Sequence, residues 1–338
     1  MAATAASTAT DHWTCDILVV GAGPAGCAAA MEGARRGLDV VVVDKARFPR
    51  DKCCGDGLTT SALRQLDELG LDPSTLPSWI EVGDVTIRSP RGHTPRLDLP
   101  REQGSFAAVC RRRELDEALV ALTRRQGVTL LEGHELQAVE PGADSVSATV
   151  NGITFVSRYL IAADGMWSPT RKLLGLATPD YRGDWHAFRQ YFANVSAEAA
   201  RELVVWFEPD LLPGYAWSFP LGDGSANVGF GIRRGQGPSI QDMKHLWPDL
   251  LARPHIAGFL GPNAEAEGPH RAWPIPARLG GLPLTRDRIF FVGDAGAATD
   301  PLTGEGIGQA IETARIAISA IGDTGRNDPK GAATLYQR

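Results

Sequence analysis

The order of apolar and polar residues divides the chain into two kinds of segment. Near its start, two segments at residues 16–20 and 39–44, each holding four consecutive apolar residues, flank a glycine turn at 21–26 and a helix-like segment at 27–36. Continuous Val and Ile runs are typical of parallel strands that are buried on both faces of a sheet. The pattern therefore predicts a strand–helix–strand unit at the start of an α/β fold.

The same reasoning predicts further elements along the chain: a helix at 113–126, a strand at 128–131, a hairpin that runs into a buried strand at 147–163, a short strand at 288–292 and a helix at 306–321. The segments 80–104 and 181–279 differ, because they alternate more and carry many Pro, Gly and Trp residues. This composition is expected of an antiparallel sheet with functional loops.

We therefore predict two domains and a tail. Residues 15–79, 105–180 and 280–338 form the α/β domain, and residues 80–104 and 181–279 form an inserted antiparallel sheet domain that binds the substrate. Residues 1–14 are rich in Ala, Ser and Thr and are expected to be a disordered tail without a signal peptide. Residues 322–338 are expected to form a loop that enters a truncated helix.

Composition and charge narrow the class of partner. Hydrophobic residues are 43% and charged residues 22% of the 338, as in an ordinary globular protein. The net charge of −6 gives no overall positive charge that would attract nucleic acid. The sequence contains no run of about 18 apolar residues, so no membrane-spanning helix is predicted. The 5 cysteines and 7 histidines lack metal-ligand spacing. We predict a cytoplasmic monomer without a metal, acting on a small molecule.

The first chemical motif is Gly21-x-Gly23-x-x-Gly26 between the first strand and its helix. The first glycine allows a tight turn, the second lets the backbone approach a pyrophosphate, and the third permits close packing of the helix. Asp44, at the end of the next strand, is placed to accept hydrogen bonds from an adenosine ribose. An ordinary structural turn is the alternative, but the strand, helix and acid together favour a dinucleotide site.

The second motif is a strand that ends in Gly293-Asp294, followed by a turn at 300–307 that opens a helix. Such a motif would place a carboxylate against the ribityl polyol of a flavin and backbone N–H groups near the flavin ring. An enzyme that uses nicotinamide alone does not need these contacts. A surface turn with a satisfied Asp is the alternative. Together the two motifs predict an FAD-binding oxidoreductase, in which opposite ends of FAD lie on these two turns.

A third segment, Asp164-Gly165 followed by Ser168 and Arg171, completes a set of three blocks that resembles the glutathione-reductase-like FAD superfamily. The likeness is to its branch of aromatic hydroxylases, halogenases and geranylgeranyl reductases, and it implies a Rossmann-type FAD domain. In that branch an Arg at the start of a helix contacts the flavin, which here implies Arg112. A solvated helix start for Arg112 and a structural turn for Asp164 are the alternatives. The resemblance implies these cofactor contacts: Gly21, Gly23, Ala25, Gly26, Asp44, Lys45, Cys54, Gly55, Arg112, Leu136, Asp164, Gly293, Asp294, Pro301, Gly304, Gly306 and Ile307.

Two further segments resemble the geranylgeranyl reductases and their bacterial menaquinone-reductase relatives. Residues 48–58 are similar to that family's Pro-Arg-x-Lys-x-Cys-Gly-x-Gly-Leu segment, with Cys54 at the Cys position. Residues 215–220 match its Tyr-x-Trp-x-Phe-Pro signature, and Gly229-Phe-Gly231 follows. The resemblance implies saturation of isoprenoid double bonds in a prenylated lipid or quinone by hydride transfer from N5 of reduced FAD. NAD(P)H or an electron-transfer partner would supply the electrons, and a lipid substrate implies peripheral membrane contact.

Reduction of an isolated prenyl double bond develops positive charge on a tertiary carbon. Tyr215, Trp217 and Phe219 alternate along one predicted strand, so all three would line one wall and stabilise that charge by cation–π attraction. Ordinary sheet core is the alternative for these rings. Cys54 is a candidate proton relay, its pKa lowered by nearby Lys52 and Arg50, and a small packed residue is the alternative.

Two rival functions remain open at this point. An aromatic hydroxylase of the same fold is the first, while halogenation is disfavoured because residues 215–220 differ from the halogenases' Trp-x-Trp-x-Ile-Pro element at two positions. A non-catalytic module that binds flavin or carries lipid is the second.

Overall fold

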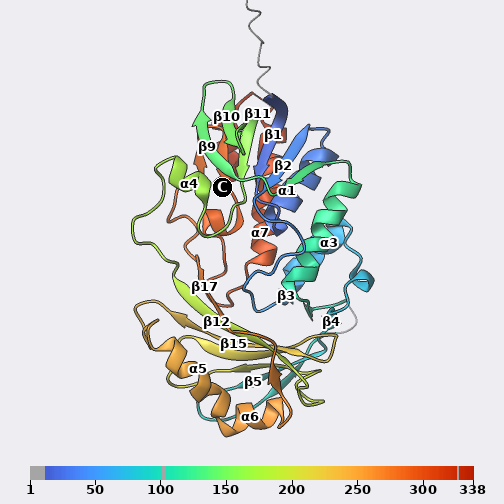
Figure 1. The fold of residues 1–338 in the computed structure, drawn as a ribbon, viewed down its shortest axis with the longest axis vertical. Helices are drawn as coiled ribbons and strands as arrows, with labels where there is room; N and C mark the ends of the chain where they lie inside the picture. Colours follow the sequence, from blue (N-terminus) through green and yellow to red (C-terminus); the bar gives the residue numbers. More distant parts are fainter. Residues whose placement is uncertain (1–11, 101–103, 326) are drawn as a thin grey trace, which may run out of the picture.

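The protein has two lobes, each built on an eight-stranded sheet. The computed structural model describes residues 12–100, 104–325 and 327–338. In Figure 1 the upper lobe holds the first sheet with α1, α3 and α7, and the lower lobe holds the second sheet with α5 and α6. Most of the predicted tail, residues 1–11, lies outside the described residues.

The core of the first sheet is parallel and follows the order β18-β19-β11-β1-β2-β8. Strand β1 pairs in parallel with both β2 and β11, and β11 pairs in parallel with β19. The bounds are β1 (His12–Val20), β2 (Val40–Asp44), β8 (Thr129–Glu132), β11 (Ile153–Ala162), β18 (Thr285–Arg286) and β19 (Ile289–Phe291). The predicted strand–helix–strand unit is confirmed. The predicted end of the tail at residue 14 is wrong, because His12 already pairs with Thr154 of β11.

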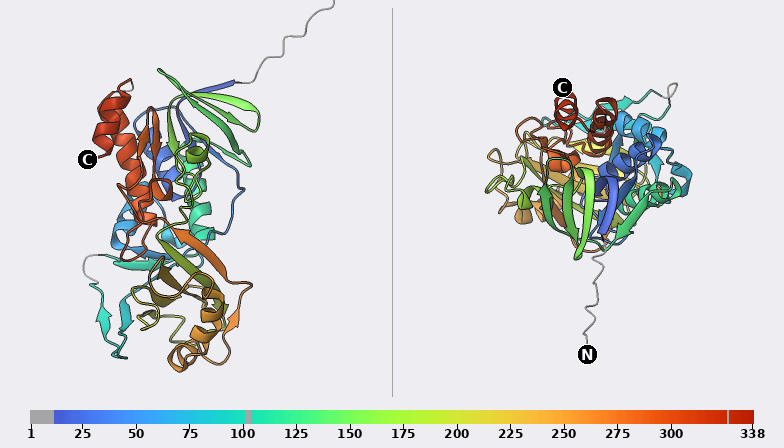
Figure 2. Two further views of the ribbon diagram at one scale, coloured as in Figure 1. Left: turned by 90° about the vertical axis from the view of Figure 1, so that its left-hand side faces the viewer. Right: turned by 90° about the horizontal axis from the view of Figure 1, so that it is seen from above.

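Both faces of this sheet are covered, which explains the continuous apolar runs. Ile17 and Val19 pack into one core with the helices, whereas Leu18 and Val20 pack into a second core with the β9–β10 hairpin. The helices on the first face are α1 (Pro24–Arg35), α3 (Arg112–Arg125) and α7 (Ile307–Asp323), and the hairpin consists of β9 (Leu136–Pro141) and β10 (Val146–Val150). Figure 2 shows α7 beside α8 (Pro329–Tyr336) on the outside of the upper lobe.

The second sheet follows the order β16-β12-β15-β14-β13-β5-β6, and β17 also pairs with β12. Its bounds are β5 (Asp84–Arg88), β6 (Arg96–Asp98), β12 (Trp185–Ala193), β13 (Leu203–Trp206), β14 (Tyr215–Pro220), β15 (Ala226–Arg233), β16 (Glu265–Ala266) and β17 (Arg271–Ile275). The prediction of a wholly antiparallel sheet is wrong at one pair, because β13 and β5 run in parallel. These two strands come from the two separate segments of the predicted insert, so no hairpin fixes their direction.

One face of the second sheet is closed by two helices that the sequence pattern did not predict. Helix α5 (Met243–Ala252) packs Met243, Trp247 and Leu250 onto the sheet, and helix α6 (Pro254–Leu260) packs Ile256 and Leu260. The helical spacing of these apolar residues was masked by Pro248, which lies inside α5. The opposite face of the sheet is therefore the one that turns toward the first lobe.

A small third sheet lies where the lobes meet. It contains β3 (Gly57–Thr59), β4 (Ile80–Glu81) and β7 (Ala107–Val109), with β7 in the middle. The predicted insert begins at residue 80, yet β4 pairs with this small sheet and the second sheet is entered only at β5. The remaining elements are α2 (Thr60–Leu69), α4 (Pro169–Leu173) and two short 3-10 turns, Pro73–Thr75 and Gly293–Gly296.

Candidate cofactor and substrate site

The two glycine turns meet at the carboxyl edge of the first sheet. Val20 is in register with Ala162 of β11, which is in register with Phe291 of β19. A Cβ atom built on Gly293 would lie 3.4 Å from the Cβ atom of Ala25, so the second turn touches the helix that follows the first. The two glycine turns that were predicted to bind opposite ends of FAD therefore lie side by side in the structure.

The first turn has the geometry that its glycines predict. Gly21 has a φ of +104°, and a Cβ there would lie 2.4 Å from the Ala163 carbonyl oxygen. A Cβ on Gly26 would lie 1.7 Å from the Gly21 carbonyl oxygen, so neither position accepts a side chain. Asp44 holds the turn by accepting hydrogen bonds from the Ala22 and Ala46 N–H groups, each at 2.7 Å. Its predicted bond to a ribose would add to these.

A cavity of about 1270 Å³ runs from these turns to the second sheet. It exceeds the roughly 300–1,000 Å³ of ordinary ligand pockets, which is enough for a large cofactor together with part of a substrate. Its wall includes these predicted cofactor residues: Gly21, Gly23, Ala25, Asp44, Lys45, Cys54, Gly55, Arg112, Leu136, Asp164, Asp294, Pro301, Gly304, Gly306 and Ile307. Gly26 and Gly293 lie behind that wall, in the contacts described above.

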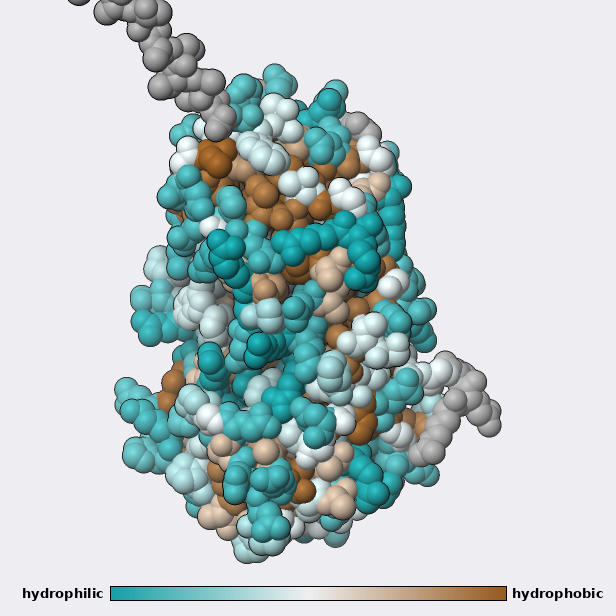
Figure 3. Space-filling view, turned by 45° about the vertical axis from the view of Figure 1, so that its right-hand side comes forward, coloured by the Kyte–Doolittle hydropathy of each residue, from teal (hydrophilic) through white to brown (hydrophobic). Residues whose placement is uncertain are grey.

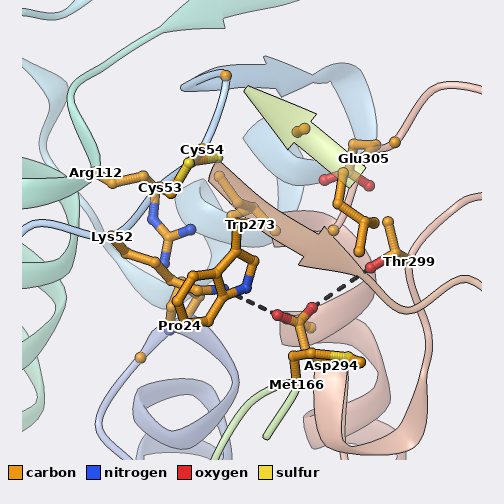
Figure 4. Close-up of a pocket in the computed structure, with 18 of the residues that line it drawn as sticks. Pro24, Lys52, Cys53, Cys54, Arg112, Met166, Trp273, Asp294, Thr299 and Glu305 are labelled. Atoms are coloured by element: carbon orange, nitrogen blue, oxygen red, sulfur yellow. Dashed lines mark hydrogen bonds and ion pairs between the residues drawn. The ribbon is translucent and has the colours of Figure 1, made fainter. Parts of the chain in front are cut away.

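Asp294 lies at the centre of the cavity wall and is paired with a lysine (Figure 4). Its Oδ2 is 2.9 Å from the Nζ of Lys52, and the Thr299 hydroxyl donates to Oδ1 at 3.4 Å. Burial opposes ionisation, yet the nearby Lys52 ammonium lowers the pKa of Asp294 below its usual value. The predicted polyol-binding carboxylate is thus charged, and Lys52 is a functional candidate that the sequence analysis did not assign to the cofactor.

Arg112 lines the cavity and is buried, so the prediction's alternative of a solvated helix start is wrong. Only 4% of Arg112 is exposed, and its guanidinium forms a two-point ion pair with Asp116 at 2.9 and 3.0 Å. Burial works against its charge, but Asp116 and the Cys54 side chain raise the pKa of Arg112. Arg50 also pairs with Asp116, at 3.0 Å. The cations next to Cys54 in the sequence are therefore engaged by Asp116 and Asp294, and the cation beside its side chain is Arg112.

The three aromatic residues of β14 form one wall of the cavity. The Tyr215 and Trp217 rings are 6.0 Å apart, as are the Trp217 and Phe219 rings. The glycines of β15 make room for them: Gly229 is in register with Trp217, and a Cβ on Gly229 would lie 2.4 Å from the indole. The rings face the cavity and not the apolar core under α5 and α6.

The comparison with known families decides the class of the protein. The sequence model described as FAD binding domain matches residues 14–326. The chain belongs to this family. Menaquinone reductase of Mycolicibacterium smegmatis is 34% identical to this FAD-binding protein, over 95% of this chain and 80% of the relative. Digeranylgeranylglycerophospholipid reductase 1 of Methanopyrus kandleri is 30% identical, over 95% and 84%.

A solved structure resembles the FAD-binding protein over nearly its whole length. It is the geranylgeranyl bacteriochlorophyll reductase-like protein of Thermoplasma acidophilum, with a TM-score of 0.83 at 25% identity, covering 96% of this chain and 82% of that chain. The predicted resemblance to geranylgeranyl and menaquinone reductases is therefore confirmed, and the protein is an FAD-dependent oxidoreductase with a mixed α/β FAD-binding fold.

The residues of the cavity fit FAD. Gly23 is the N-cap residue of helix α1 and no side chain caps this end, so the N–H groups of the first turn are available to a phosphate. A Cβ on Gly23 would meet only the end of the Arg50 side chain, at 3.5 Å, so the backbone there borders open space. Gly21 to Gly23 would hold the pyrophosphate, Asp44 a ribose, and Asp294 the polyol.

Asp164 lines the cavity and also accepts a hydrogen bond from the Thr170 N–H at 2.8 Å. Its position is therefore compatible with both predicted roles, a cofactor contact and a structural turn residue.

The loop that carries Cys54 is clamped to the second sheet by residues that the sequence analysis missed. Asp51 pairs with Arg189 of β12 at 2.6 Å and with Arg271 of β17 at 3.1 Å. Asp56 is fully buried and accepts a hydrogen bond from the Tyr191 hydroxyl at 2.7 Å. Asp56 has a φ of +67° and lies between glycines, so in the sequence it looks like an ordinary turn residue.

Burial raises the pKa of Asp56 from 3.8 to about 6, although hydrogen bonds from Tyr191 and Asn227 act in the opposite direction. The folded protein thus binds this proton more tightly than the unfolded chain does. The stabilisation is complete below pH 3.8 and is lost as the pH rises through about 6. Over this window we expect the free energy of unfolding of the wild type, relative to that of Asp56→Asn, to fall by about 2–3 kcal/mol. Melting temperatures of the two proteins, measured across the window, would follow this change. A difference that does not change with pH would contradict the raised pKa.

Within the described residues, no helix is long and apolar enough to cross a membrane. The same part of the chain contains no group of three or more His, Cys, Asp or Glu side chains that could hold a metal ion. On the face shown in Figure 3, hydrophilic side chains predominate and hydrophobic ones occur in small separate groups.

Proposed function

We propose that this oxidoreductase saturates isoprenoid double bonds in a prenylated lipid or the prenyl chain of a quinone, using hydride from reduced FAD. The observation that carries the proposal is an apolar surface on the second sheet that continues from the aromatic wall. Trp217 of β14 is in register with Val205 of β13, which is in register with Ile87 of β5. All three line the cavity.

A second row of apolar side chains runs beside the first. Leu203 is in register with Val85, and both line the cavity, as does Phe219 on β14. Val85 is in turn in register with Leu97 of the edge strand β6, and Leu97 is 48% exposed. The two rows form an aliphatic track that leads from the aromatic rings to the edge of the sheet. A flexible hydrocarbon chain fits such a track, whereas a small aromatic substrate would leave most of it uncovered.

The reaction adds a hydride to one carbon of the double bond and a proton to the other. Reduced FAD supplies the hydride. The three rings of β14 would stabilise the developing charge on the tertiary carbon, by about 1–2 kcal/mol each where water is excluded. The apolar side chains of the track would exclude water and hold the chain extended. Cys54, beside Arg112, is the proposed proton relay.

The names of the relatives support a prenylated substrate. One is named for menaquinone and another for a digeranylgeranylglycerophospholipid, and both molecules carry isoprenoid chains. NAD(P)H or an electron-transfer partner as donor, a monomeric state, a cytoplasmic location and peripheral membrane contact remain parts of the proposal. The parallel sheet with α1 at its glycine turn likewise supports, as a proposal, the glutathione-reductase-like Rossmann classification.

The direct test uses purified FAD-loaded protein, reduced with dithionite and mixed without oxygen with a geranylgeranyl lipid, which has no quinone ring that the reductant itself could reduce. We expect the product to gain one dihydrogen per saturated double bond in the mass spectrum, and the flavin absorbance to return as the lipid is consumed. The same mixture in air distinguishes the hydroxylase alternative, because a hydroxylase would give a product that has gained an oxygen atom. An unchanged lipid under both conditions would overturn the proposal.

A further inference from the structure

The cavity wall on the second sheet has a gap in its layer of side chains. Gly231 of β15 is in register with Tyr215 of β14 on one side and with Ala187 of β12 on the other. Ala187 is in turn in register with Trp273 of β17, and all four residues line the cavity. Two neighbouring strands therefore present almost no side chain to the cavity at this level, whereas an aromatic residue stands on the strand at each side.

The gap is wide enough for a flat ring system. Tyr215 and Trp273 are three strand spacings apart, which corresponds to about 14 Å between their backbones. A Cβ atom added to Gly231 would meet only the His186 carbonyl oxygen, at 4.0 Å, so the space above this glycine is open. A planar group could therefore lie flat against the backbone of β15 and β12, with an aromatic residue at either end.

Two buried hydrogen-bond donors at the β17 side of the gap have no acceptor in the part of the chain that the structure describes. They are the Trp273 Nε1 and the Arg189 Nε. Arg189 follows Ala187 by two residues on β12, lines the cavity and is only 3% exposed. A buried donor without an acceptor is unfavourable, so these two groups indicate that a ligand brings an acceptor to this end of the gap.

The charges along this part of the wall are already balanced, which argues against an anionic acceptor. The three cations are Arg189, Arg271 and Lys52, and the three carboxylates are Asp51, Asp56 and Asp294. Both arginines pair with Asp51, at 2.6 and 3.1 Å. Lys52, whose Nζ lies 6.0 Å from the Trp273 ring, pairs with Asp294 at 2.9 Å (Figure 4). Asp56 is close enough to Arg189 to favour its charge. A phosphate here would be repelled by the same carboxylates, whereas a carbonyl oxygen would accept from the two donors without adding a charge.

We propose that this gap binds the head group of the prenylated substrate, and that the head group is an uncharged planar ring with carbonyl oxygens at its edge, as in a quinone. The inference rests on the proposed function, and it selects the quinone over the phospholipid. The prenyl chain would leave the gap over the rings of Tyr215 and Trp217 and continue along the aliphatic track. A glycerophosphate head group is neither flat nor uncharged, so it matches neither property of the gap.

The test measures binding to the oxidised, FAD-loaded protein by isothermal titration calorimetry, so that no reduction is involved. The probes are dimethylnaphthoquinone, glycerol phosphate and geranylgeraniol, which represent the two head groups and the chain separately. The ring of dimethylnaphthoquinone is fully substituted, so it has no free position for the Cys54 thiol to attack. The decisive variant is Gly231→Leu, because Gly231 lacks a positive φ and a leucine there would fill the gap. Val205→Trp is its matched control, since it fills the track instead.

We expect the wild type to bind dimethylnaphthoquinone and geranylgeraniol but not glycerol phosphate. Gly231→Leu should weaken the binding of dimethylnaphthoquinone about tenfold or more and leave geranylgeraniol unchanged, and Val205→Trp should do the reverse. Trp273→Phe keeps a ring but removes one donor, so it should weaken dimethylnaphthoquinone about threefold.

Three results would overturn the proposal. The first is binding of glycerol phosphate in place of the quinone, and the second is unchanged quinone affinity in Gly231→Leu. The third is loss of FAD from Gly231→Leu, because the flavin is itself a planar ring with carbonyl oxygens and would then be the group that fills the gap. Failure of the proposed function is a separate result: if geranylgeraniol did not bind while dimethylnaphthoquinone still did, the head-group site would stand without the prenyl chain.

Discussion

Gly23→Ala should give a folded protein that has largely lost FAD. The backbone at Gly23 has φ −74° and ψ −173°, which alanine adopts freely, and the new methyl group would meet only the Arg50 side chain at 3.5 Å. The apo protein should therefore keep its stability to within about 1 kcal/mol. The methyl group would, however, stand where the pyrophosphate approaches the start of α1. Losing close charged hydrogen bonds there should weaken FAD binding about 10- to 100-fold.

The measurement is the FAD affinity of apo protein, titrated by flavin fluorescence, together with the melting temperature without FAD. Gly258→Ala is the matched control, because Gly258 lies in α6 with no atom within 4 Å of an added Cβ. It should bind FAD like the wild type. If Gly23→Ala bound FAD with unchanged affinity, the pyrophosphate would not pass over this turn, and the assignment of this end of the cavity would be wrong.

The first lobe could be predicted well because each of its signals is local. Strand β1 is buried on both faces, and its residues 17–20 are accordingly an unbroken apolar run. Gly21 and Gly26 could be recognised as essential glycines, because the backbone packs too closely there for a side chain. The meeting of the two turns then follows from parallel pairing, since the carboxyl ends of neighbouring parallel strands share an edge of the sheet. The elements that were predicted in this lobe needed correction only at their ends, such as the start of β1 at His12, whereas helix α2 was not predicted.

The second lobe was harder to predict because its decisive contacts join residues that are distant in the chain. The parallel pairing of β13 with β5 brings residues near 205 to residues near 87, and no turn signals it. Asp56 likewise finds Tyr191 and Asn227 only after both lobes have formed. Buried polar networks of this kind leave no periodic trace, so Asp56, Arg189 and Asn227 were missed, whereas the alternating rings of β14 were not.

Val205→Trp should block the aliphatic track and so reduce activity according to the length of the substrate. Val205 lies between Trp217 and Ile87 on the cavity side of the sheet, and it is only partly buried, so an indole there would extend into the cavity and not into the core. A long prenyl chain must pass this point, whereas a short one can react beside the rings of β14. We expect kcat/KM for a geranylgeranyl lipid to fall about 10- to 100-fold, with little change for a substrate of one isoprene unit.

Leu97→Trp is the matched control for this change, since Leu97 lies at the exposed end of the second row, on the edge strand β6. A bulky side chain there leaves the middle of the track open, so both substrates should react nearly as before. FAD content and melting temperature should match the wild type in both variants. Equal losses for long and short substrates in Val205→Trp would mean that the rings of β14 had moved. Full activity on the long chain would mean that the chain does not follow β13, and the aliphatic rows would then be no more than the lining between two lobes.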